Sequence, residues 1–112
     1  MNSNTVALES VASPAMNRTA HLLTILSEEC AKVAQRASKA SRFGLAEIQP
    51  GQDFTNAERI MHEVAHITAV IRMLESAGAL EVPEDFEDRI GLKMVNVDHY
   101  LDYSRDCGTL CS

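Results

Sequence analysis

The chain has 112 residues, enough for one domain with a single modest core. Hydrophobic residues make up 46% of it, but aromatic residues only 4% and tryptophan is absent, so the core must come from aliphatic side chains and methionine, which favours helices over a β-sandwich. A formal charge of −6 excludes a general role in binding duplex nucleic acid, because such proteins need a basic face.

The first half of the chain predicts a tail followed by a long helix. Residues 1–16 contain Ser, Asn and Pro without sustained periodicity, and we expect a mobile N-terminal tail there, followed by one helical domain over 17–112. A helix is predicted from about residue 17 or 19 to 42, ending at Phe43-Gly44. Its apolar face, at i, i+3, i+4 spacing, is Leu22, Leu23, Ile25, Leu26, Val33, Ala34, Ala37 and Ala40.

Two further helices are predicted after a loop over 45–54. Thr55-Asn56-Ala57-Glu58 is a capping box that begins the second helix, and Gly78 is its expected left-handed end. The third helix is expected to carry Pro83 in its first turn and to end near Cys107-Gly108. The expected buried stripes are Ile60, Val64, Ile67, Ile71 and Leu74 in the second helix and Phe86, Ile90, Met94, Val97 and Leu101 in the third.

These elements predict an all-α fold, an antiparallel bundle of about three long helices. Three helices leave a thin core, so we expect a homo-oligomer that completes the bundle. The three cysteines form no even disulfide framework, no signal sequence is recognisable, and no apolar run approaches the roughly 18 residues that span a bilayer. We therefore expect a cytoplasmic protein with reduced thiols and no membrane association.

An acidic pair, Glu28 and Glu29, flanks the apolar face of the first helix, and Glu63 and His66 share one flank of the second. Two helices packed through their apolar faces would bring these four side chains together. Several carboxylates that lose their water when the helices pack cannot all stay ionised unless a cation neutralises them. Mg²⁺ or Mn²⁺ is the natural choice. The alternative is a solvated helix face on which Glu28 and Lys32 form an ordinary ion pair.

These residues carry a resemblance to a known family. Ser27-Glu28-Glu29-Cys30-Ala31-Lys32 followed by Glu63-Val64-Ala65-His66 resembles the EExxE and ExxD motifs of the MazG-like all-α nucleoside triphosphate pyrophosphohydrolases, especially small phage-encoded members. The stretches QRASKASRFGL, QPGQDFTNAER and YLDYSRDCGTL are also similar, so the resemblance covers roughly residues 20–110. It implies a Mg²⁺-dependent enzyme, a homodimer or homotetramer, that converts an NTP or dNTP to a monophosphate and pyrophosphate, in the host cytoplasm if phage-encoded.

The resemblance implies that Glu28, Glu29 and Glu63 are metal ligands and that Glu28 or Glu29 positions or deprotonates the attacking water. Lys32 replaces the third Glu of the family pattern and His66 replaces its Asp. Lys32 should weaken cation binding and is free to contact a phosphate instead, whereas His66 still ligates a metal as neutral imidazole but favours Mn²⁺ or Zn²⁺ over Mg²⁺. A catalytically silent relative that binds nucleotides or acts as an oligomeric interaction protein is the alternative.

Basic residues also recur along the first helix, at positions 32, 36, 39 and 42. A solvated face is the plain interpretation of this stripe. Under the resemblance, the candidate nucleotide- and phosphate-binding residues are Lys32, Lys39, Arg42, Lys93, Tyr103 and Ser104.

The stretch His62-Glu63-Val64-Ala65-His66 is also a literal HExxH, the motif in which two histidines bind Zn²⁺ and the glutamate activates water. A zinc peptidase needs a third protein ligand and a substrate-binding scaffold, and no spacing in this short helical chain recommends a third ligand. A zinc-binding HExxH protein is therefore a minor alternative.

Overall fold

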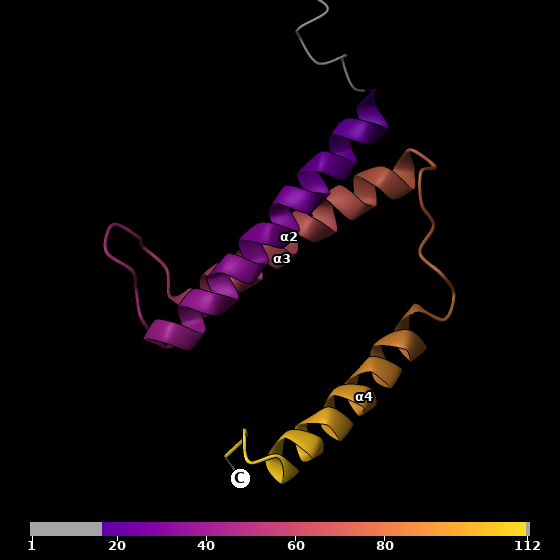
Figure 1. Ribbon diagram of the computed structural model, residues 1–112. Coiled ribbons are helices and arrows are strands. Elements are labelled where there is room, and N and C mark those ends of the chain that lie inside the picture. Colours follow the sequence, from indigo (N-terminus) through magenta and orange to yellow (C-terminus); the bar gives the residue numbers. More distant parts are fainter. Residues whose placement is uncertain (1–16, 112) are drawn as a thin grey trace, which may run out of the picture. The chain divides into compact units, whose positions relative to one another are not determined.

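The computed structural model describes residues 17–111, and this part of the chain contains three α-helices and no strand: α2 (Arg18–Phe43), α3 (Asn56–Ser76) and α4 (Phe86–Asp106) (Figure 1). The predicted all-α fold class is confirmed. The tail expected over residues 1–16 lies outside the described residues. Within 17–111, none of the helices combines the length and apolar character that crossing a lipid bilayer requires.

The chain divides into two compact units, one ending at Leu80 and containing α2 and α3, the other running from Glu81 and containing α4. In the first unit α2 and α3 form an antiparallel hairpin joined by a loop, seen in purple and brown in Figure 1. The sequence accounts for the bounds of α2. Asn17 caps its start by accepting a hydrogen bond from the Ala20 N–H at 2.8 Å, and Gly44, at a φ of 103°, ends it.

Helix α3 begins at the predicted capping box. Thr55 Oγ1 accepts from the Glu58 N–H at 3.1 Å, and the Glu58 carboxylate accepts from the Thr55 N–H at 3.0 Å. At the other end Gly78 has a φ of 73°, and the Ala79 N–H bonds the Leu74 carbonyl, so the predicted left-handed end is also confirmed.

The apolar core of the hairpin is small and lies where α2 begins and α3 ends. Leu22, Val70 and Leu74 are buried, and Ile25 and Leu26 pack against them. Leu74 is completely buried. This core holds the two helices in register, and the opposite half of their interface is polar.

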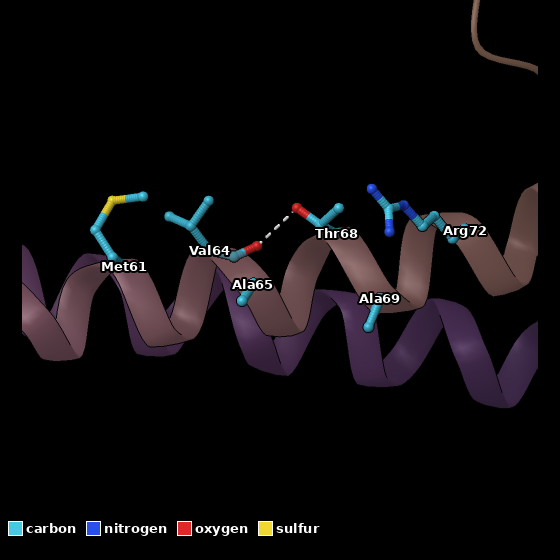
Figure 2. A pocket seen from close by; sticks show the side chains of 6 residues that line it. All are labelled: Met61, Val64, Ala65, Thr68, Ala69 and Arg72. Carbon is cyan, nitrogen blue, oxygen red and sulfur yellow. Dashed lines mark hydrogen bonds between the residues drawn. The ribbon is translucent and has the colours of Figure 1, made fainter.

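The predicted buried faces were partly wrong. Leu23 is half exposed, and Val64 faces outward with Met61 and Thr68, as Figure 2 shows. The buried neighbour of Val64 is Glu63, one position earlier. Because one residue turns a helix by 100°, apolar side chains on two sides of α3 made the buried face ambiguous in the sequence.

Helix α4 starts at Phe86, three residues after Pro83, so the prediction that Pro83 lies in its first turn was wrong. The Phe86 N–H instead bonds the Pro83 carbonyl in the preceding turn, and Asp85 occupies the N-cap position, where its carboxylate accepts from Arg89 Nε at 3.0 Å. The C-terminal end near Cys107 and Gly108 is as predicted. The predicted stripe from Phe86 to Leu101 is exposed along its length.

The capping box predicts an acid-dependent loss of stability. The backbone N–H of Thr55, and then its side chain, hydrogen-bond the Glu58 carboxylate and lower the pKa of Glu58 from its ordinary value of 4.5. A folded-state pKa below the unfolded one stabilises the protein above about pH 4.5, and this contribution is lost as the pH falls through the folded value. We expect Glu58→Gln to unfold at a lower temperature than the wild type at pH 7, with the two melting temperatures converging as the pH falls below 4.5 through the lowered pKa of Glu58. A pH-independent difference would contradict this.

Candidate metal centre

The interface between α2 and α3 changes character along its length. The buried residues of α3 recur at steps of three, four and seven, so they share one face of the helix: Asn56, Arg59, Glu63, Val70 and Leu74. The last two belong to the apolar core, while the first three carry polar or charged side chains. Charged groups are seldom buried without a partner, so this polar half of the interface is where a bound group is expected.

Three of the predicted ligands meet in this polar half. Glu29 comes from α2, and Glu63 and His66, one turn apart, come from α3. His66 Nδ1 lies 3.2 Å from Glu63 Oε2 and 3.5 Å from Glu29 Oε2, and one ligand atom of each residue lies within 4.8 Å of the others. The two carboxylate side chains are only 13% and 12% exposed, whereas His66 is 57% exposed, so the group is open to solvent on the histidine side.

Glu29 Oε2 is buried and has no hydrogen-bond partner. Two ionised carboxylates can only accept, so neither Glu29 nor Glu63 can satisfy the other unless one holds a proton. A hydrogen bond from Glu63 is the first cause that lowers the pKa of Glu29; Lys32 and His66 lower it further, while burial opposes them. The pKa of Glu29 is therefore lowered, and the nearest cationic side chain to its Oε2 is the imidazole of His66 at 3.5 Å, which lies beyond good hydrogen-bond length.

The three groups fit a divalent cation. Octahedral ligands at about 2.1 Å from Mg²⁺ lie about 3 Å apart in cis positions, close to the two distances from His66 Nδ1. A cation would also satisfy the buried oxygen of Glu29. Two carboxylates suit Mg²⁺ or Mn²⁺, and the imidazole shifts the preference toward Mn²⁺ and later transition metals. Three protein ligands leave further positions for water or a phosphate.

Lys32 lies beside this group. Its Nζ is 3.2 Å from Glu29 Oε1, so its ion-pair partner is Glu29 and not the Glu28 that the sequence suggested. The lysine side chain is about half exposed. It neutralises one acidic ligand and is long enough to turn toward a bound anion.

The other predicted site residues lie outside this group. Glu28 is exposed on α2, next to Glu29 in sequence but absent from the three-residue cluster. Lys39 is half-buried, and Arg42 is exposed with its guanidinium 4.7 Å above the Phe43 ring. Three more belong to α4 in the second unit, where they are exposed or half-buried: Lys93, Tyr103 and Ser104.

His62, the first histidine of the HExxH motif, is not part of the cluster. Its ring meets the Phe54 ring edge to face, with 4.8 Å between centroids. Helical spacing places His62 and His66 one turn apart, and both line the same hollow beside the cluster. The zinc alternative thus has two imidazoles on one wall, but among residues 17–111 His62 belongs to no group of three or more candidate metal ligands.

This hollow, of about 220 Å³, also holds two arginines, one from each helix. Arg59 was missed as a site residue, and Arg36 was noted only as part of the basic stripe. The hollow is lined by Arg36, Gln52, Phe54, Arg59, His62, Glu63 and His66. The signal in the sequence was the spacing of Asn56, Arg59 and Glu63, which puts polar residues on the buried face of α3.

Comparisons of the chain with protein-family models, curated proteins and solved structures found no match. The resemblance to the MazG-like family therefore rests on its motifs.

Proposed function

We propose that the protein is a divalent-cation-dependent nucleoside triphosphate pyrophosphohydrolase, which converts an NTP or dNTP to the monophosphate and pyrophosphate. The observation that carries the proposal is the buried, unpartnered Oε2 of Glu29 beside Glu63 and His66. A ligand set from two helices, open on one side, suits a cation that must also reach a substrate. The resemblance of these residues to the MazG-like motifs supplies the reaction, and a cytoplasmic location follows from the same proposal.

In this proposal Glu29, Glu63 and His66 hold Mg²⁺ or Mn²⁺. When bound, the cation polarises the phosphate and lowers the pKa of a water molecule near it. The water oxygen attacks the α-phosphorus, the bond from that phosphorus to the bridging oxygen breaks, and pyrophosphate leaves. Glu29 and its exposed sequence neighbour Glu28 are the carboxylates proposed to position that water and accept its proton. The solvent-open side at His66 is the route by which substrate would enter.

A catalytically silent nucleotide-binding protein is the second candidate, and the position of Lys32 favours it. An ammonium group 3.2 Å from Glu29 already neutralises one ligand, so a cation must compete with it. In this alternative the lysine replaces the cation and a nucleotide binds without being cleaved. The two candidates share the site and differ in whether pyrophosphate is released.

The test is incubation of the purified protein with each common NTP and dNTP, with Mg²⁺, Mn²⁺ or Zn²⁺, followed by detection of pyrophosphate. The proposal predicts release with at least one nucleotide, faster with Mn²⁺ than with Mg²⁺ because of the imidazole ligand. Nucleotide binding without pyrophosphate release under every condition would favour the silent alternative. Stoichiometric Zn²⁺ retained through purification and lost in His62→Ala would favour the zinc alternative.

Lys32→Gln is expected to tighten cation binding. Removing a positive charge about 5 Å from a bound divalent cation relieves a repulsion of roughly 1 to 2 kcal/mol in water-like surroundings, since the lysine is half exposed. We expect the dissociation constant for Mn²⁺, measured by calorimetric titration at low salt, to fall about fivefold to thirtyfold. Lys39→Gln is the matched control on the same helix. Weaker binding in Lys32→Gln would show that the lysine supports the site instead of competing with the cation.

We also propose that the protein is a homodimer or homotetramer in which a second copy covers the outward face of α3. That face carries a hollow of about 420 Å³ between Met61, Val64, Ala65, Ala69 and Arg72, most of them apolar (Figure 2). Burying it would thicken a core that contains few buried side chains. Light scattering coupled to size exclusion should give twice or four times the chain mass, and a monomer at micromolar concentration would contradict this.

A further inference from the structure

Two arginines line the hollow beside the cluster, and at least one of their buried N–H groups has no hydrogen-bond acceptor. Arg59 is buried, with only 9% of its surface exposed, and its Nη1 donates to Gln49 Oε1 at 2.9 Å. A guanidinium carries five N–H groups, and this hydrogen bond uses one of them. Arg36 faces the same hollow from α2, and its Nε is buried without a hydrogen-bond partner. Two guanidiniums from different helices thus converge on one space.

We infer that this hollow binds the phosphate chain of the substrate, with Arg36 and Arg59 holding its non-bridging oxygens. The inference rests on the proposed function. A guanidinium matches the geometry of a phosphate group, to which it donates two parallel hydrogen bonds, and a buried donor without a partner gains most from such an acceptor. Arg36 supplies that unpartnered donor.

The size of the hollow sets which part of the substrate it takes. Sites that enclose a whole small molecule usually measure about 300–1,000 Å³, and this one measures about 220 Å³. It has room for a phosphate chain, and the base and sugar would lie outside it. This assignment differs from Lys39 and Arg42, the phosphate contacts implied by the resemblance.

The hollow and the metal cluster share two residues, Glu63 and His66. A phosphate chain lying against Arg36 and Arg59 would therefore reach the cation position directly. Its negative charge would then be shared between a cation on one side and two arginines on the other, as phosphoryl transfer requires.

The loop that forms one wall of the hollow is fixed before any ligand binds. Asn56 Nδ2 donates to the Gly44 carbonyl and to Glu47 Oε1, both at 2.9 Å, and the Asn56 N–H bonds the Glu47 carbonyl. Arg59 holds the same loop through Gln49. Because these bonds tie the loop to the start of α3, the loop loses little conformational entropy when a ligand binds in the hollow.

Calorimetric titration of the full-length protein with inorganic pyrophosphate, with tripolyphosphate and with adenosine, each with Mn²⁺ and again with a chelator, tests the inference. We expect both phosphate chains to bind under at least one condition and adenosine not to bind under either. Arg36→Gln should weaken pyrophosphate binding at least about tenfold, because a charged hydrogen bond is lost. Arg18→Gln, an exposed arginine about 27 Å away along α2, should change it less than twofold.

Arg59→Lys is the second variant, because it keeps the charge of a buried arginine and removes only the fork of donors. It should weaken pyrophosphate binding by a similar factor while circular dichroism shows the same helix content. Unchanged pyrophosphate affinity in Arg36→Gln and folded Arg59→Lys, or no pyrophosphate binding to the wild type at all, would overturn the inference.

The outcomes separate this inference from the proposed function. Arginine-dependent pyrophosphate binding without hydrolysis of any nucleotide would support the phosphate site and count against the pyrophosphohydrolase. Hydrolysis with an unchanged KM in Arg36→Gln and Arg59→Lys would support the enzyme and overturn the phosphate site.

Discussion

The Glu63→Gln variant is expected to release pyrophosphate at least about 100-fold more slowly than the wild type while unfolding at the same or a higher temperature. Loss of even an outer partner of a metal site costs about 10–100-fold, and Glu63 is a proposed direct ligand. Stability should not suffer, because glutamine has the same shape, keeps an oxygen that can accept from His66 and adds an N–H near the Oε2 of Glu29, which has no hydrogen-bond partner. Steady-state assays and thermal unfolding in a chelator measure the two effects.

Glu75→Gln is the matched control, since Glu75 is exposed on the same helix about 18 Å from Glu63. It should leave the rate within about twofold. If Glu63→Gln instead unfolds at a much lower temperature with an unchanged rate, the buried glutamate has a structural role and the site has been misassigned.

Leu74→Ala should destabilise the protein by about 2–5 kcal/mol, the largest stability effect we expect from one substitution. Leu74 is completely buried and belongs to a small cluster of buried residues with Leu22 and Val70. Because the core is so small, few neighbouring side chains can shift to fill the cavity that the substitution leaves. For a domain of this size each kcal/mol lowers the melting temperature by several degrees, so a fall of at least about 10 °C is expected.

Leu23→Ala is the control for this loss, because Leu23 is 50% exposed and lies next to the buried Leu22. Its effect should stay below about 1 kcal/mol. Urea unfolding followed by circular dichroism measures both variants. Equal losses in Leu74→Ala and Leu23→Ala would mean that the exposed face of α2 is buried in solution, for instance against a second copy.

The helix bounds were predictable because local chemistry determines them. Thr55 and Glu58 satisfy each other's backbone donors, and Gly44 and Gly78 take positive φ, whatever the rest of the chain does. The prediction for Pro83 was wrong because a proline suits a turn before a helix as well as the first position of the helix.

The position of Glu29 in the site was predictable because it lies one turn from an apolar residue that packs against the core. Glu29 lies four residues from Ile25, and the structure brings it to Glu63 and His66 as expected. The role of Arg59 was not predictable from residue type, because an arginine near the start of a helix is usually exposed. Only the tertiary pairing of α2 and α3 shows that its spacing from Glu63 puts it on the buried face.

The faces of α3 show why register is harder to predict than helix bounds. Val64 and Glu63 are adjacent, and an apolar pattern alone ranks the valine as the buried one. In the structure the glutamate is buried and the valine lies on the outward hollow. A polar side chain buried in the helix interface reverses the usual order, so a position where the hydrophobic pattern fails is a reasonable place to look for a site.

Binding of Mn²⁺, followed by electron paramagnetic resonance as the ion is titrated into metal-free protein, tests the central claim most directly. We expect one tightly bound Mn²⁺ per chain, competed by Mg²⁺, and loss of that binding in both Glu29→Gln and Glu63→Gln, one variant on each helix. A wild type that binds no Mn²⁺, or binding that survives both substitutions, would contradict the claim that Glu29, Glu63 and His66 form a metal centre.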